Sequence, residues 1–155
     1  MKQKNPPLPL PGPVNSSWHV GIIHSSYYKE EVDALVSGAE RTLREAGILP
    51  GSIRTFSVPG SFEIPLLGEA LARTKEVDAL IGLGIVVQGE THHAALVAGE
   101  AARGIMDVQL RHGIPFAFEI LSVDRLELAR ARLDRGEEAA RSVLHSLAQL
   151  ARIRG

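Results

Sequence analysis

The residues best suited to bind an anion and move a proton lie in one short segment, Gly84–His93, which reads G-I-V-V-Q-G-E-T-H-H. A glycine-flanked turn that enters a helix presents free backbone N–H groups to an anion, and the Thr91 hydroxyl adds a donor. A histidine beside a bound phosphate is favoured in its protonated form, which suits acid–base work near neutral pH. The segment predicts a phosphate site with a histidine beside it, although a threonine that only caps a helix has the same appearance.

Metal chemistry has little support in the same segment. His92 and His93 are adjacent, and adjacent side chains on a helix point about 100° apart. Metal ligands on helices usually recur at i, i+3 or i, i+4 instead. The chain also contains no cysteine, which excludes thiolate nucleophiles and Cys-ligated zinc or iron–sulfur sites. We therefore expect no metal site.

Three other segments offer binding groups. A tyrosine of Ser25-Ser26-Tyr27-Tyr28 can stack on a planar heterocycle or simply pack at a rim. Glu63, in Val58–Pro65, can accept hydrogen bonds from a polyol or only stabilise a helix dipole. One arginine of a basic cluster can complete a phosphate clamp, while the rest form a solvated face. The cluster consists of Arg125, Arg130, Arg132 and Arg135.

The elements that must position these groups alternate between short apolar runs and longer helical patterns. Such alternation predicts βαβ units and a parallel sheet, at whose carboxyl edge ligands bind. We predict an α/β fold: a three-layer sandwich with a four-stranded parallel sheet, flavodoxin-like, with helices on both faces. The predicted strands are His19–His24, Ile53–Val58, Ala79–Val87 and Phe116–Leu121.

Helical periodicity predicts the segments between these strands. The first helix carries Val32 to Ala46 and stops at Gly47, and the second spans about Glu63–Thr74. The third, about Thr91–Arg111, is rich in small residues, which hints at close helix packing between subunits. Ser122 is the expected N-cap of a helix over Arg125–Leu133. Gly136 is expected to break that helix before a last amphipathic one.

Composition sets the class of protein. The chain has 155 residues, 45% of them hydrophobic and 23% charged, with a net charge of −1, which predicts one packed domain and disfavours nucleic acid as a partner. Residues 1–17 carry five of the nine prolines, and we interpret them as a Pro-rich flexible arm before a single domain over 18–155. No apolar run is long enough to cross a membrane, so we expect a cytoplasmic location.

Three motifs, in order and at the right spacing, resemble the 6,7-dimethyl-8-ribityllumazine synthase family of riboflavin biosynthesis. They are VPGSFEIP at Val58–Pro65, GIVVQGETHH at Gly84–His93 and GIPFAFEILS at Gly113–Ser122, and the resemblance extends from about Trp18 to the C-terminus. It implies that the chain joins 5-amino-6-ribitylaminouracil to 3,4-dihydroxy-2-butanone 4-phosphate. Phosphate and water leave and the pyrazine ring closes, with no metal and no organic cofactor.

The resemblance also assigns residues by position. It implies that Tyr27 stacks on the pyrimidine ring and that His93, not His92, is the catalytic histidine. Phe118 matches an aromatic residue that a neighbouring subunit contributes. Glu90, Thr91 and Arg132 fall where the butanone phosphate is held. The positions that hold the ribityl chain and line the pyrimidine are Ser61, Phe62, Glu63, Ile85, Val86 and Val87.

Three departures from the family pattern are visible. Gln88 stands where many members have a basic residue, and Ala94-Ala95 stand where an aromatic residue and a carboxylate are usual. The linker Leu133–Gly136 after Arg132 is short, and the usual linker commonly carries a lysine. Arg130 or Arg135 can take the role of Arg132 if the helix is shifted.

Two classes of function follow from the resemblance. The enzyme is favoured, because a pure shell protein does not need Glu63, Thr91, His93 and Arg132 together. The alternative is a non-catalytic flavin- or lumazine-binding relative, or a shell-forming structural relative. A generic flavodoxin-like nucleotide binder is disfavoured, because no G-x-G-x-x-G follows a strand. The family also implies a homopentamer at minimum, with a decamer, a 60-subunit icosahedral shell and association with riboflavin synthase left open.

Overall fold

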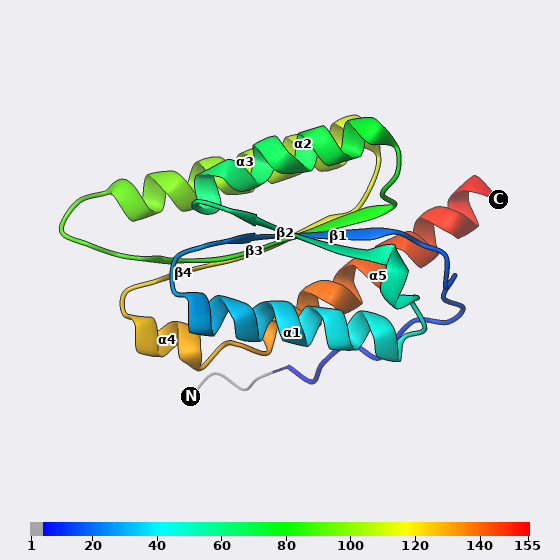
Figure 1. Cartoon of the computed structure of the whole chain (residues 1–155), viewed down its shortest axis with the longest axis horizontal. Coiled ribbons are helices and arrows are strands. Elements are labelled where there is room, and N and C mark those ends of the chain that lie inside the picture. Colours follow the sequence, from blue (N-terminus) through cyan, green and yellow to red (C-terminus); the bar gives the residue numbers. More distant parts are fainter. Residues whose placement is uncertain (1–4) are drawn as a thin grey trace.

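A computed structural model describes residues 5–155, in which four strands form one sheet between two helical layers (Figure 1). The strands are β1 (Val20–Ser25), β2 (Ile53–Val58), β3 (Ala79–Val87) and β4 (Phe116–Val123). They lie in the order β2-β1-β3-β4, and every pair is parallel. The predicted parallel sheet is confirmed, and its carboxyl edge gathers the loops that follow the four strands.

Two helices cover one face of the sheet and three cover the other (Figure 1). The first layer contains α2 (Ile64–Thr74) and α3 (His93–His112). The second contains α1 (Lys29–Glu45), α4 (Leu126–Arg130) and α5 (Arg135–Arg154). Short 3₁₀ turns, η1 (Pro50–Ser52) and η2 (Ser61–Glu63), precede β2 and α2. The predicted three-layer sandwich is confirmed.

Alternation along the central strands divides the core between the two layers. In β1, Ile22 packs toward α1 and α5, whereas Ile23 packs toward α2 and α3. In β3, Ile81 and Leu80 divide in the same way, and all four side chains are fully buried. Because successive side chains on a strand point to opposite faces, each of these residues packs against one particular helical layer. Burying each side chain contributes about 1.5–3 kcal/mol to the stability of the fold.

Three predicted boundaries are wrong. Ser122 is not a helix N-cap, because β4 continues to Val123 and Arg125 is the cap of a shorter α4. The third helix begins at His93 instead of Thr91, because Gln88–His92 form an irregular loop. Gly136 does not break a helix, because it is the second residue of α5. At that position α5 lies directly against the backbone of α1.

The contact at Gly136 gives a prediction for stability. A Cβ at this position would lie 2.1 Å from the Leu35 carbonyl oxygen, so Gly136→Ala forces α1 and α5 apart. We expect it to lower the free energy of unfolding by about 1–3 kcal/mol, as overpacked sites do. Urea unfolding measures the change, with Gly51→Ala as the control, because a Cβ there meets nothing within 4 Å. Equal stability of the two variants would contradict the close approach of the helices.

The N-terminal segment follows the α5 side of the domain (Figure 1). The His145 imidazole Nε2 lies 2.7 Å from the Pro9 carbonyl oxygen. Val14 and Trp18 pack against the core beneath α1 and α5, and the Leu49 N–H donates to the Ser16 carbonyl at 3.2 Å. Residues 1–4 of the predicted arm lie outside the described residues. The rest of the arm has specific contacts with the domain.

Glu119 on β4 gives a prediction for pH dependence. It lines a hollow of about 360 Å³ with Glu138, Arg141, Ser142 and arm residues Asn5–Leu8. Burial raises the pKa of Glu119 to about 7, against the opposing effect of Arg135, whose Nη1 lies 4.0 Å from its Oε1. The folded chain therefore binds this proton more tightly than the unfolded chain. The contribution of Glu119 to stability falls as the pH rises from 4.5 through about 7.

Replacement of Glu119 by glutamine removes this titration. We expect Glu119→Gln to raise the Tm relative to the original protein at pH 8 and to change it much less at pH 5. Thermal unfolding at both pH values measures the two differences. An equal difference at pH 5 and pH 8 would contradict a proton held by Glu119 in the folded state.

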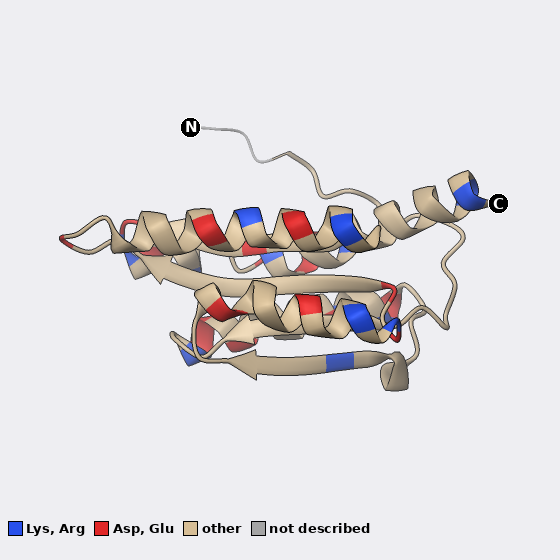
Figure 2. Cartoon of the chain, turned by 90° about the horizontal axis from the view of Figure 1, so that it is seen from above, with Lys and Arg blue, Asp and Glu red and all other residues tan. Residues whose placement is uncertain are grey.

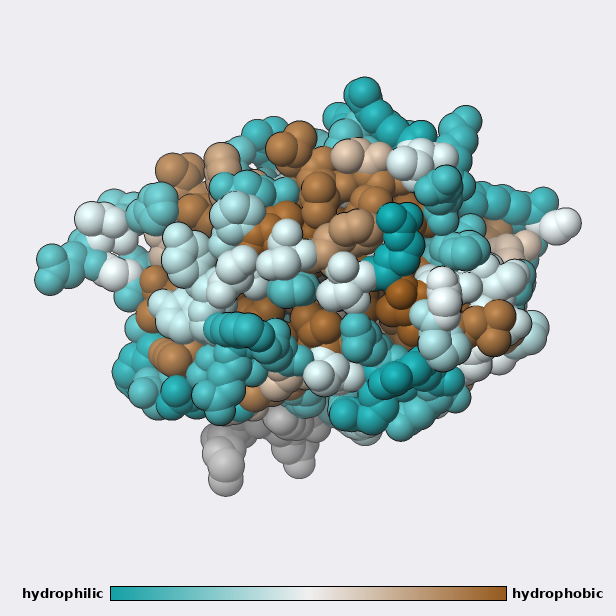
Figure 3. All heavy atoms as spheres, viewed as in Figure 1, coloured by the Kyte–Doolittle hydropathy of each residue, from teal (hydrophilic) through white to brown (hydrophobic). Residues whose placement is uncertain are grey.

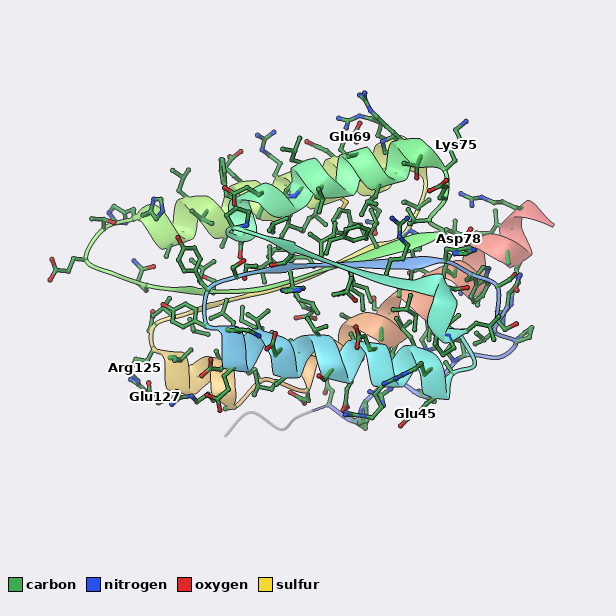
Figure 4. All side chains as sticks on the ribbon, in the orientation of Figure 1. Glu45, Glu69, Lys75, Asp78, Arg125 and Glu127 are labelled. Atoms are coloured by element: carbon green, nitrogen blue, oxygen red, sulfur yellow. The ribbon has the colours of Figure 1, made fainter. Side chains whose placement is uncertain are left out.

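Charged side chains elsewhere connect surface elements. Basic and acidic residues are interspersed along the helices (Figure 2). Glu69 on α2 receives His112 Nε2 at 2.8 Å and Arg111 Nη1 at 2.9 Å, both from the end of α3. The His112 hydrogen bond, followed by those from Arg73 and Arg111, lowers the pKa of Glu69 to about 2. Figure 4 places Glu69, Lys75 and Asp78 toward one end of the domain, and Arg125 and Glu127 near the other.

Candidate active site

The carboxyl end of β3 extends beyond that of β1. His24 pairs with Leu83 at the end of the β1–β3 ladder, whereas β3 continues to Val87 beside Val123 of β4. The last residues of β3 are therefore not covered by β1. Instead, the β1–α1 loop, η2 and the start of α3 surround them. The last three residues of β3, Ile85–Val87, therefore form one wall of a cavity.

This cavity has a volume of about 570 Å³. It brings together eight of the residues that the sequence predicted for the site, from four separate segments of the chain. The predicted residues that line it are Tyr27, Ser61, Phe62, Glu63, Ile85, Val86, Val87 and His93. A hollow of this size can enclose a small heterocyclic ligand.

Glycine at position 60 lets two of these side chains approach. The Gly60 N–H donates to Glu63 Oε2 at 3.1 Å. A Cβ at Gly60 would lie 3.3 Å from that oxygen and 3.4 Å from Tyr27 Cε2, so the carboxylate and the aromatic ring both lie against the same glycine. Tyr27 is 67% exposed. It therefore presents a free ring surface beside a hydrogen-bond acceptor, as a polar heterocycle requires.

His93 is the first residue of α3 and lines the cavity. Its backbone N–H lies 3.4 Å from Thr91 Oγ1, and Gln88 Nε2 donates to the Thr91 carbonyl at 3.1 Å. Both bonds fix the loop that leads into α3. Glu90 and Thr91 themselves are exposed and do not line the cavity. The loop places the imidazole at the cavity and the predicted phosphate residues just outside it.

Two predicted residues lie farther away. Phe118 is 41% exposed on β4, opposite Gly82 in the ladder, and Arg132 is in the turn between α4 and α5. Neither lines the cavity. The Arg132 guanidinium Nη1 donates to the Leu128 carbonyl at 2.7 Å. Both residues belong to the β4–α4 side of the molecule, where β4 is the last strand of the described sheet.

The other arginines of the cluster have partners of their own. Arg130 Nε donates to Glu31 Oε1 at 3.1 Å, and Glu31 is a buried carboxylate on α1. Arg135 Nη1 donates to Glu138 Oε2 at 3.1 Å. The first ion pair connects α4 to α1, whereas the second lies within α5. Arg130 and Arg135 would have to leave them to replace Arg132.

Five residues that line the cavity were not among the predicted site residues: Tyr28, Pro59, Gly60, Leu96 and Val97. Leu96 and Val97 follow His93 by three and four residues, so helical spacing could have placed them on its face. Tyr28 lies beside Tyr27 in the loop where a stacking tyrosine was predicted, and it caps α1 in a left-handed conformation with φ of 57°. Leu96 and Val97 form an apolar part of the cavity wall. They follow directly after Ala94 and Ala95, which depart from the family pattern.

The described residues contain no cluster of three or more His, Asp or Glu side chains that could hold a metal ion. Within the same part of the chain, no helix combines the length and the apolarity that crossing a membrane requires. The residues that line the cavity supply one imidazole, one carboxylate, a serine, aromatic and apolar walls, and the backbone of β3. Such a set can orient a planar polar ligand and transfer protons to or from it.

Comparisons with known proteins agree with the motifs. The sequence model of the 6,7-dimethyl-8-ribityllumazine synthase family matches residues 17–151. The enzyme of that name from Xanthobacter autotrophicus is 39% identical over 124 residues, or 76% of this chain and 73% of the relative. Those from Ruthia magnifica and Paracidovorax citrulli are 38% and 40% identical, covering 83% and 79% of this chain and 83% and 80% of the relatives. The chain belongs to the 6,7-dimethyl-8-ribityllumazine synthase family.

Proposed function

We propose that this chain condenses 5-amino-6-ribitylaminouracil with 3,4-dihydroxy-2-butanone 4-phosphate to give 6,7-dimethyl-8-ribityllumazine, phosphate and water. The observation that carries the proposal is the convergence of Tyr27, Glu63 and His93 on one cavity at the end of β3. These residues come from three loops that follow three different strands. The family membership of the chain supports the same reaction.

The proposed binding mode follows from the chemistry of the walls. The pyrimidine stacks against Tyr27 and Phe62, and its polar edge bonds the backbone of Ile85–Val87. Glu63 accepts hydrogen bonds from the ribityl hydroxyls. The phosphate of the second substrate lies outside this part of the cavity, near Glu90 and Thr91, at the loop that leads into α3. With the pyrimidine at Tyr27 and the phosphate near Thr91, the ketone of the second substrate lies beside His93.

The proposed reaction proceeds in four steps. The 5-amino group attacks the ketone, and loss of water gives an imine. A proton leaves the adjacent carbon and phosphate departs by β-elimination. The side chain then reorients, and the ribityl-substituted amine closes the ring with loss of a second water. His93 transfers protons in these steps, which is worth about 10²–10⁴-fold for one acid–base group. Orientation of the two reactants supplies much of the remainder.

We further propose that the site is shared between copies of the chain, in a homopentamer at minimum. Phe118 and Arg132 are both outside the cavity of their own subunit and on the side of β4. Large hydrophobic side chains are also exposed on α2 and α3, with Leu66 72% and Leu110 73% exposed. Figure 3 shows hydrophobic residues gathered over this layer. A decamer, a 60-subunit shell, association with riboflavin synthase and a cytoplasmic location are further predictions from the family.

The decisive experiment mixes the purified protein with both substrates and follows the visible absorbance of the lumazine. A control without protein measures the spontaneous condensation. We expect the protein to accelerate product formation well above this control. Folded protein that binds the aminopyrimidine without acceleration would contradict the enzyme and favour a binding or shell-forming relative.

A further inference from the structure

Two loops of the cavity, one between β1 and α1 and one between β2 and η2, are joined at Ser26. The Ser26 hydroxyl Oγ donates to the Val58 carbonyl oxygen at 2.6 Å, and the Ser26 backbone N–H donates to the Pro59 carbonyl oxygen at 3.3 Å. Ser57 Oγ lies 3.1 Å from Ser26 Oγ. The single hydroxyl hydrogen of Ser26 goes to Val58, so Ser57 is the donor to Ser26. One serine is therefore bonded to three successive residues of the other loop.

These bonds lie one residue away from the groups that form the floor of the cavity. Ser26 directly precedes Tyr27, and Pro59 directly precedes Gly60. A Cβ at Gly60 would lie 3.4 Å from Tyr27 Cε2 and 3.3 Å from Glu63 Oε2. The bonds of Ser26 therefore determine how the Tyr27 ring lies against Gly60 and beside the Glu63 carboxylate.

The Tyr27 ring depends on the main chain for its position. It is 67% exposed, so most of its surface is in contact with solvent and not with other side chains. On its C-terminal side, the Tyr28 carbonyl accepts the Val32 N–H at 2.9 Å, at the start of α1. On its N-terminal side lies Ser26. Tyr27 is therefore held between two anchored residues, and Ser26 is the one that connects it to the opposite loop.

The Ser26 hydroxyl contributes more to loop geometry than to the stability of the fold. Ser26 is exposed, so water can replace its hydrogen bonds when the hydroxyl is removed. Such an exchange costs little in the free energy of unfolding. Water does not replace the covalent connection between the bonded hydroxyl and the adjacent aromatic residue. Loss of the hydroxyl therefore affects the place of the ring before it affects the fold.

We propose that Ser26 is a positioning residue of the substrate site, which holds the Tyr27 ring where it stacks on the aminopyrimidine. The proposal rests on the proposed function and adds to it a residue that does not line the cavity. Fixing the β1–α1 loop to Val58 and Pro59 puts the ring in place before the substrate binds. Such preorganisation lowers the entropy cost of binding. Proton transfer at His93, on the other side of the cavity, does not depend on it.

The test measures the equilibrium Kd of 5-amino-6-ribitylaminouracil without the second substrate. We expect Ser26→Ala to raise this Kd about 3- to 10-fold, as loss of one hydrogen bond does. Ser26→Thr keeps the hydroxyl and should restore the Kd to within about 2-fold of the original value. The kcat and the KM for the butanone phosphate should remain unchanged in both variants. Ser37→Ala, at an exposed position on α1, is the control.

An unchanged Kd in Ser26→Ala would overturn the proposal. A Kd as high in Ser26→Thr as in Ser26→Ala would also overturn it, because the hydroxyl would then not be the group that acts. A loss of kcat equal to the rise in Kd, together with a lower Tm, would make Ser26 a structural residue only. Absence of turnover in the original protein would contradict the proposed function alone, because the Kd values would still show whether Ser26 acts on binding.

A double variant tests whether Ser26 acts through the ring of Tyr27. The Kd of Ser26→Ala/Tyr27→Ala should equal that of Tyr27→Ala, because the serine has no ring left to position. Effects that multiply in the double variant would overturn the assignment to Tyr27.

A second ligand separates the ring of the substrate from its ribityl chain. The compound 5,6-diaminouracil carries the pyrimidine ring without that chain, and Ser26→Ala should raise its Kd by the same factor. An unchanged Kd for this compound, with a raised Kd for the ribityl compound, would place the effect at Glu63 and overturn the proposal.

Discussion

His93→Ala should lower kcat about 10²-fold and leave the KM values of both substrates nearly unchanged. The imidazole lines the cavity at the first turn of α3, where it can transfer protons but is not needed to hold either substrate. One acid–base group contributes about 10²–10⁴-fold. We expect the lower part of that range, because the condensation proceeds slowly by itself once the reactants are aligned. Steady-state kinetics with each substrate varied in turn measures the change.

His92→Ala is the matched control. His92 has the same side chain, directly precedes His93 as the N-cap of α3, is exposed, and does not line the cavity. Its substitution should leave kcat within about 2-fold of the original value, because no proton transfer is assigned to it. A similar loss of kcat in both variants would assign the effect to the loop instead of the imidazole. A raised KM with unchanged kcat in His93→Ala would make His93 a binding residue.

The sheet could be predicted from local patterns in the sequence, whereas most of the predicted cavity residues came from the resemblance to the family. The run Ala79–Val87 is apolar apart from its glycines, as a strand covered on both faces must be. Once the strands are parallel, the loops after them share one edge. Tyr27, Glu63 and His93, which follow three different strands, therefore had to come together.

Two of the three wrong boundaries have a common cause. Ser122 and Gly136 were interpreted from their intrinsic preferences, for a helix cap and a helix break, and tertiary contacts overrode both. Ser122 pairs with Val86 in the sheet, and Gly136 allows α5 to lie against the Leu35 carbonyl. The relevant partner in each case is far away along the chain. Local sequence does not contain such information.

The hydroxyls of Ser25 and Ser61 are buried without a hydrogen-bond partner, and this could not be predicted from the sequence either. Ser61 was a predicted site residue through its motif, whereas Ser25 was only the start of a loop. Their proximity depends on the register of β1 against β3, and a shift of one residue would turn Ser25 to the other face of the sheet. Only the three-dimensional arrangement shows that two buried donors lie against Gly84.

The position of Arg132 leads to the prediction that tests sharing of the site. Arg132→Glu should lower kcat/KM for the butanone phosphate about 10- to 100-fold, because a charge-assisted bond to phosphate is lost and replaced by repulsion. The KM for the aminopyrimidine should change much less. Yet Arg132 is outside the cavity that contains His93 of the same chain. If a neighbouring copy supplies this arginine, the two defects can be separated in mixed assemblies.

Mixed assemblies of His93→Ala and Arg132→Glu should therefore be more active than either variant alone. In a random 1:1 assembly, about a quarter of the sites combine an intact His93 from one copy with an intact Arg132 from its neighbour. The two tagged variants are coexpressed, and assemblies that contain both are isolated by sequential affinity steps. Mixtures of the original protein with His93→Ala, prepared in the same way, calibrate the loss caused by dilution alone. If Arg132 serves its own cavity, every mixed site keeps one defect, and the activity stays at the mean of the two variants.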